Sequence, residues 1–188
     1  MYSFRNSVDN LADDFIKSLP CHIQKPYPSA KMTFQNKQVA EMLLSAYANG
    51  GNSEMSAIAQ YISHHETIED ENVSDSIFCI ALVEMLHLDM IGTLIQSLGG
   101  DLRFWQPNHF YWSGGYVNYG NSLCEKLSLD IVAEQEAISG YSHLLREVNP
   151  QNIPSLRQVE AVLQRIKEDE EMHLNLFIEM YSKYCGNK

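Results

Sequence analysis

Two segments of the chain repeat one arrangement of a carboxylate and an imidazole. Glu84 is followed three residues later by His87, and Glu170 is followed in the same way by His173, each time within the pattern Glu-x-x-His-Leu. Residues three positions apart lie on the same side of a helix, so each pair can offer an oxygen and a nitrogen to one metal ion. The pattern therefore indicates metal binding by two helices.

A second repeated motif precedes each pair. It reads Glu-x-x-Ala-Ile-x-x-Tyr, and its copies run from Glu54 to Tyr61 and from Glu134 to Tyr141. The glutamate and the tyrosine are seven residues apart, which is two turns along one helical face. The chain thus looks like two copies of one helix pair, and each copy supplies one further glutamate beside its Glu-x-x-His pair.

Four glutamates packed together in a core would be unstable without a compensating charge, because burial and mutual repulsion both oppose ionisation. Two divalent ions bring four positive charges to four carboxylates. We therefore predict a centre of two metal ions, manganese or iron, with six ligands: Glu54, Glu84, His87, Glu134, Glu170 and His173. Each ion takes the lone glutamate and the histidine of one copy, and Glu84 and Glu170 bridge the ions. The alternative is four surface glutamates and two ordinary helix histidines.

Residues near these ligands are candidates for supporting roles. Asp169 can reach the outer nitrogen of His87 on the neighbouring helix and so fix its metal-binding tautomer, unless its side chain faces solvent. Val83 occupies the matching position in the other copy, so no equivalent support is expected there. Tyr61 and Tyr141 either donate hydrogen bonds to the site, act as redox-active phenols or pack in the core.

Other polar residues have no partner motif in the sequence. Glu136 lies one residue off the expected ligand face and is interpreted as a surface charge. His64, His65 and His143 are assigned no function.

The repeat requires helices to carry it, and hydrophobic periodicity predicts five of them. They cover residues 37–48, 53–66, 74–97, 121–148 and 155–184. Residues 101–120 form a long connector rich in aromatic residues, which either crosses between distant helices and covers the bundle or gates a substrate. We predict an all-α fold, a four-helix bundle with a long middle crossover. Residues 37–188 form this domain, and residues 1–36 form an N-terminal extension with one helical turn near 11–19.

Composition narrows the classes of partner. The chain has 24 acidic and 13 basic residues, a net charge of −11, which disfavours nucleic-acid and membrane-surface binding. Its longest apolar run, residues 77–83, is too short for a membrane span, and its N-terminus has no signal-peptide core. The cysteines lie far apart without a Cys-x-x-Cys pair, which indicates reduced thiols in the cytoplasm. They are Cys21, Cys79, Cys124 and Cys185.

At these residues the chain resembles the ferritin-like superfamily of carboxylate-bridged dimetal proteins. The order Glu, Glu-x-x-His, Glu, Glu-x-x-His is shared with rubrerythrins and bacterioferritins. The segment 48–61, with Gly50-Gly51 ahead of Glu54, is more similar to manganese catalases and to the spore-coat proteins that resemble them. The resemblance covers residues 37–184. It implies a ferritin-like bundle that forms homo-oligomers, in which the extension could wrap a neighbour, and it makes a spore-coat location possible.

The resemblance also implies a function. A manganese-catalase-like protein disproportionates or reduces hydrogen peroxide, with Glu84 and Glu170 fixing the metal spacing and a carboxylate or a tyrosine (Tyr61 or Tyr141) moving protons. With iron, the implied activity shifts to a peroxidase or an oxidase of dioxygen that needs an external electron donor. The cysteine-rich module of rubrerythrins is not found in this chain. The alternatives are iron oxidation or storage of the ferritin type, and a coat component with a vestigial site.

Overall fold

The described part of the chain is almost entirely helical. The computed structural model describes residues 15–16, 18–106, 108, 110–148 and 154–186. Its α-helices are α2 (Lys37–Ala48), α3 (Glu54–Glu66), α4 (Glu71–Ser97), α5 (Leu123–Val148) and α6 (Arg157–Cys185). These bounds lie within three residues of the predicted ones, so the all-α prediction is confirmed. The largest difference is at α4, which begins early because Asp70 accepts hydrogen bonds from the amides of Asn72 and Val73.

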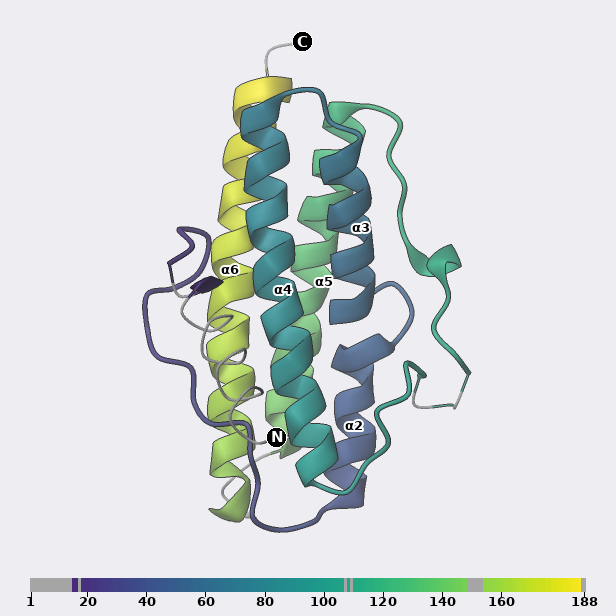
Figure 1. Ribbon diagram of the computed structural model, residues 1–188, viewed down its shortest axis with the longest axis vertical. Coiled ribbons are helices and arrows are strands. Elements are labelled where there is room, and N and C mark those ends of the chain that lie inside the picture. Colours follow the sequence, from purple (N-terminus) through teal and green to yellow (C-terminus); the bar gives the residue numbers. More distant parts are fainter. Residues whose placement is uncertain (1–14, 17, 107, 109, 149–153, 187–188) are drawn as a thin grey trace, which may run out of the picture.

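The five described α-helices pack side by side as a bundle of four columns (Figure 1). One column is α2 stacked end to end with α3, and the others are α4, α5 and α6. The connection after α4 runs along the outside of the bundle to its opposite end, so that α5 points in the same direction as α4 (Figure 1). This long crossover is the predicted one.

The break between α2 and α3 places the first lone glutamate. Gly50 has a φ of +58°, a conformation that favours glycine, and it lies in the turn that ends α2. The hydroxyl of Ser56 donates to the Gly50 carbonyl oxygen, which ties the break to the first turn of α3. Glu54 is the first residue of α3 and is buried.

The apolar core is divided into two parts by a polar layer. One cluster contains Leu43, Leu94 and Leu163, and the other contains Ile77 and Phe177. On α4 the first cluster lies after residue 90 and the second before residue 84, so the predicted ligands on this helix fall between them. The two apolar clusters pack the helices together on either side of the polar layer.

Within the described residues, α4 is the one helix that is long and apolar enough to cross a membrane by length and composition. Its most apolar window has a mean hydropathy of 1.8, and 56% of that window is buried inside the bundle. In this fold α4 packs against α2, α3 and α6, which is the situation of a central bundle helix.

The prediction that the four cysteines are reduced thiols is wrong. The structure pairs Cys21 with Cys79 and Cys124 with Cys185 in disulfides. Sequence spacing misled because each partner lies about 60 residues away, and only the packed helices bring the two sulfurs together. The cysteines therefore no longer favour a reducing compartment.

The described part of the N-terminal extension lies along α4 and α6 of the same chain (Figure 1). Met32 donates its amide hydrogen to Ser97 of α4, and Gln158 of α6 donates to the carbonyl oxygens of Ser29 and Lys31. Most of the helical turn predicted at residues 11–19 falls outside the described residues.

Candidate metal centre

Six side chains converge in the polar layer at the middle of the bundle. They come from four helices, and each residue is at most 4% exposed. They are Glu54 of α3, Glu84 and His87 of α4, Glu134 of α5, and Glu170 and His173 of α6. The structure thus brings together all six of the ligands that the repeat predicts.

These side chains form two overlapping groups. In one, ligand atoms of Glu54, Glu84, His87 and Glu170 all lie within 4.8 Å of one another. In the other, the same holds for Glu84, Glu134, Glu170 and His173. A sphere of that size suits one ion bound at about 2.0–2.2 Å from each oxygen or nitrogen. Glu84 and Glu170 belong to both groups, so they lie where bridging ligands would be.

Each histidine points one ring nitrogen into the site and the other out of it. Nε2 of His87 lies 3.2 Å from Oδ2 of Asp169, which is fully buried. Nε2 of His173 lies 3.0 Å from the carbonyl oxygen of Cys21, in the N-terminal extension. Support for His87 is where the sequence placed it, whereas the support for His173 comes from a residue that sequence reasoning missed.

The outer contacts settle which nitrogen carries hydrogen. A carbonyl oxygen can only accept, so the Nε2 of His173 must donate. Its Nδ1 is then an acceptor when the ring is neutral, yet it faces Glu84 Oε1 at 2.8 Å and Glu170 Oε2 at 3.4 Å. The same applies to His87, whose Nδ1 lies 3.1 Å from both Glu84 Oε2 and Glu170 Oε1. Acceptors that face one another require a proton or a cation between them.

Buried polar atoms without hydrogen-bond partners point to the same need. Among the described residues, Glu84 Oε1, Glu134 Oε2, Glu170 Oε1 and His173 Nδ1 are buried and have no hydrogen-bond partner. Leaving such groups unpaired is costly, and each of them is a good ligand for a transition metal. The donor set therefore fits a pair of divalent cations.

The pKa values show that burial of this many ionisable groups is unfavourable without cations. Burial raises the pKa of Glu54 and of Glu134 well above the usual value, and the carboxylates of Glu84 and Glu170 raise both further. Burial alone would lower the pKa of the two histidines, but the surrounding carboxylates outweigh it and raise both well above the usual value. Divalent ions would replace those protons and neutralise the carboxylates.

The two tyrosines of the repeat connect the halves reciprocally. Tyr61 of α3 donates its hydroxyl hydrogen to Oε1 of Glu134 on α5, and Tyr141 of α5 donates to Oε1 of Glu54 on α3. Burial raises the pKa of both phenols well above the usual value, and the adjacent glutamates raise it further. Both therefore stay protonated and act as hydrogen-bond donors.

A cavity of about 310 Å³ reaches this centre from the side of α3 and α5. All four glutamates line it, together with both tyrosines. Its outer part is bordered by the small residues Ala57, Ala137 and Gly140. Glu136 and His143 are exposed at its rim, so both surface residues border the way in.

Sequence reasoning also missed a second buried polar group, next to the site. Nδ1 of His64 lies 2.8 Å from Oδ1 of Asp130, and the Gln60 amide donates to the same oxygen at 2.8 Å. Asp130 precedes Glu134 by four residues and His64 follows Tyr61 by three, so both lie on the faces that carry the site. That register was the available signal.

This group also anchors the crossover. The amide of Asn118 donates to Gln60, and Nε2 of His64 lies 3.0 Å from the Asn118 carbonyl oxygen. Earlier in the crossover, the indole of Trp112 donates to Ser56, while Phe110 remains 69% exposed. Part of the aromatic connector thus covers the bundle, as one of the two interpretations expects.

Known proteins share this architecture. The chain is 25% identical over 174 residues to a probable manganese catalase of Clostridium acetobutylicum, covering 81% of this chain and 74% of that protein. A manganese catalase from Anabaena PCC7120 matches with a TM-score of 0.75 and 22% identity, over 86% of this chain and 79% of the other. A bacterioferritin of Desulfovibrio desulfuricans, described with a diiron site, gives 0.63 and 27%, over 80% and 82%. No family model matches.

These matches agree with the geometry of the site. The chain has the helical bundle, a long crossover and two groups of carboxylates and imidazoles in its polar layer. The chain has the ferritin-like fold of the dimetal-carboxylate superfamily and is similar to manganese catalases in sequence and structure.

Proposed function

We propose that the chain binds two manganese ions and disproportionates hydrogen peroxide to water and dioxygen. The observation that carries this proposal is a pair of carboxylate and imidazole groups, each able to hold a metal ion, that share two glutamates lining a cavity of about 310 Å³. Similarity to two manganese catalases supports the choice of manganese.

The proposed ligands divide evenly between the two ions. Glu54 and His87 would hold one ion, Glu134 and His173 would hold the other, and Glu84 and Glu170, which belong to both groups, would be shared by the two ions. Such a pair of ions, when bound, supplies two electrons to one peroxide molecule and recovers them from a second. The sum is two peroxides converted to two waters and one dioxygen, without an external electron donor.

The protein side chains control orientation and proton position. Tyr61 and Tyr141 hold the carboxylates of Glu134 and Glu54 in place, and their own protons stay on the phenol oxygens. Carboxylate groups of all four glutamates line the cavity and would be in reach of an entering peroxide. They can take a proton from it and return one to the product.

Metal analysis combined with an oxygen electrode tests the proposal. We expect two Mn per chain, and one dioxygen released for every two peroxides consumed. The matched control is Glu136→Gln, which changes a carboxylate at the cavity rim outside both groups and should keep both ions. A protein loaded with two Mn that releases no dioxygen from peroxide would refute the proposed activity.

A second candidate is iron oxidation or storage. The similarity to a bacterioferritin described with a diiron site favours it, because four carboxylates and two imidazoles accept iron as readily as manganese. It predicts that added Fe²⁺ is oxidised by dioxygen or peroxide and accumulates beyond two Fe per chain. In that case peroxide would be consumed without release of dioxygen.

A further inference from the structure

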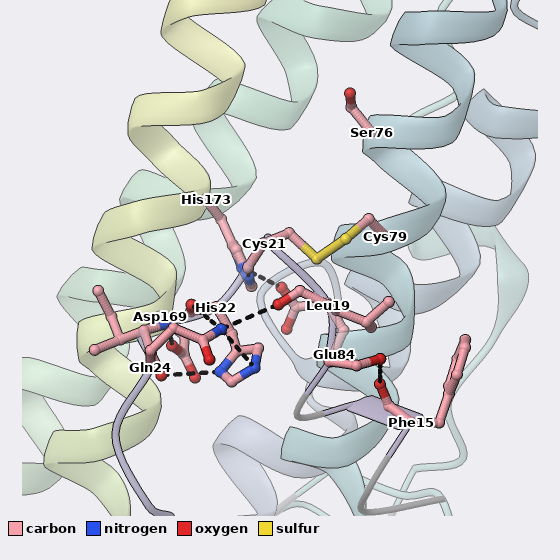
Figure 2. Close-up of a disulfide and its surroundings, with 12 residues drawn as sticks. Phe15, Leu19, Cys21, His22, Gln24, Ser76, Cys79, Glu84, Asp169 and His173 are labelled. Carbon is pink, nitrogen blue, oxygen red and sulfur yellow. Dashed lines mark hydrogen bonds and ion pairs between the residues drawn. A yellow bond between two sulfur atoms is a disulfide. The ribbon is translucent and has the colours of Figure 1, made fainter.

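Cys21 is attached to the centre of the bundle in two ways. Its sulfur is bonded to Cys79 of α4, and its carbonyl oxygen accepts the hydrogen bond from Nε2 of His173 on α6. Figure 2 shows Cys21 between the disulfide and the ring of His173. Cys21 is 4% exposed and His173 is fully buried, so this contact is shielded from water.

The extension is held differently two residues later. The amide of Ile23 donates to Asp169 Oδ1 at 2.7 Å, and Arg165 donates to the Ile23 carbonyl oxygen at 2.5 Å. From Ile23 onward, side chains of α6 therefore fix the segment. At Cys21 the covalent attachment is to α4.

A histidine that binds a metal through one nitrogen needs a partner for the other, because that partner fixes the tautomer and the angle of the ring. For His87 the partner is Asp169, a side chain in the repeat itself. For His173 it is a backbone carbonyl in an irregular segment, whose position is only as fixed as the segment.

We propose that Cys21 is a positioning residue for His173, and that its disulfide to Cys79 holds the Cys21 carbonyl oxygen where it keeps Nδ1 of His173 aimed at one ion. This inference rests on the proposed metal pair, although not on the peroxide reaction. It assigns the disulfide to one half of the site, since the support of His87 comes from Asp169, a side chain of α6 that pairs with Arg165 of the same helix.

The second disulfide offers a matched control. Cys124 and Cys185 join the first turn of α5 to the last turn of α6, at one end of the bundle. They are 61 residues apart in sequence, against 58 for Cys21 and Cys79. The two bonds close loops of nearly equal length, so their effects on the entropy of the unfolded chain are similar. They differ in contact with the site.

The test compares the double variants C21A/C79A and C124A/C185A. Alanine keeps the backbone carbonyl at position 21 and removes only the covalent attachment. In a titration of the metal-free proteins with Mn²⁺, we expect C21A/C79A to bind one of the two ions about 10–100-fold more weakly, the range typical of lost support for a ligand histidine. The other ion, and both ions in C124A/C185A, should bind as in the wild type.

Two further measurements separate positioning from general stability. The Mn²⁺ electron paramagnetic resonance spectrum of C21A/C79A should show uncoupled single ions at a concentration of Mn²⁺ where C124A/C185A shows a coupled pair. Hydrogen exchange should be faster at residues 18–22 of C21A/C79A and unchanged in α6. Unchanged affinities despite faster exchange would overturn the proposal, as would equal weakening in both double variants.

If C21A/C79A fails to fold, reduction of folded, Mn-loaded C124A/C185A provides the same test. A dithiol such as dithiothreitol gives two electrons and two protons to the Cys21–Cys79 bond, which becomes two thiols while the dithiol becomes a disulfide. Cys79 is half-buried and so within reach of the reagent. We expect reduction to accelerate the loss of one Mn per chain to a chelator about 10-fold or more, and an unchanged rate would overturn the proposal.

Failure of this inference can be distinguished from failure of the proposed function. Wild-type protein that binds two Mn without releasing dioxygen refutes the peroxide reaction and leaves every comparison above intact. Equal Mn²⁺ affinities in the wild type and both double variants refute the role of Cys21, whatever the turnover.

Discussion

The two halves of the proposed metal centre have the same set of candidate ligands but different support. Each half has a lone glutamate, a histidine and a tyrosine that reaches across to the other half. Behind the ligands the likeness ends, because His87 contacts a carboxylate of α6 and His173 contacts a backbone carbonyl of the extension. The repeat determines which atoms face the proposed ions, and residues that differ between its copies determine what contacts those ligands from behind.

One position explains the difference. Asp169 precedes Glu170, and Val83 precedes Glu84 at the equivalent place in the other copy. Valine has no polar atom and is fully buried here, so α4 offers no acceptor to His173 from this position. A buried N–H without an acceptor is costly, and the extension supplies the missing acceptor.

The largest effect is expected from removal of a glutamate that both halves share. Glu170→Ala should abolish tight binding of both ions and all peroxide turnover, because Glu170 belongs to both groups. Metal content after dialysis and the rate of oxygen release measure this. Helix content by circular dichroism should persist, since alanine favours helix and removes a buried charge. Retention of both ions at wild-type affinity would contradict the bridging role.

A smaller effect is expected from a substitution that weakens metal binding only in the half that contains His87. Asp169→Asn replaces one carboxylate oxygen by an NH₂ group, which cannot accept from Nε2 of His87. We expect about 10–100-fold weaker binding of one Mn²⁺, with the other ion little affected. The control is Glu168→Gln, which alters the exposed pair with Lys25 one residue earlier. Equal loss of both ions would mean that the halves are not supported separately.

The same variant should change the response to acid. Burial alone would raise the pKa of Asp169, but hydrogen bonds from His87, Arg165 and Tyr27 outweigh it and hold the pKa below its usual value. Its contribution to stability is therefore present above about pH 4, the unfolded value, and is lost as pH falls further. Urea unfolding of the metal-free protein should show less loss of stability between pH 5 and pH 3 in Asp169→Asn than in the wild type.

The smallest effects test the part of the site that is symmetric. Tyr61→Phe and Tyr141→Phe each remove one hydrogen bond to a glutamate of the opposite half, worth about 1 kcal/mol. We expect both variants to bind one ion up to about 10-fold more weakly and to the same extent, by Mn²⁺ titration. Exposed Tyr181→Phe is the control. Clearly unequal effects would show that the asymmetry extends to the tyrosines.

The features that could be predicted from the sequence are those that depend on the spacing of residues close together in the chain. Helix periods and the intervals between Glu54, Tyr61 and the Glu-x-x-His pairs repeat within a few turns, so they give the bundle and bring the six side chains to one layer. The disulfides and the Cys21 carbonyl depend on an irregular segment meeting α4 and α6, and no local pattern encodes that meeting. His64 and Asp130 are intermediate, because their register pointed inward although their pairing was not evident.

The opening at Gly140 makes the entrance adjustable independently of the centre. A Cβ atom added at this residue, which lines the cavity, would meet no other atom within 4 Å, so a larger side chain fits there without displacing the helices. A series from alanine to leucine at this position would test whether a larger residue slows the entry of bulky peroxides more than that of hydrogen peroxide, the proposed substrate. The size of the residue at the rim of the cavity can thus be varied while the six candidate ligands inside it stay the same.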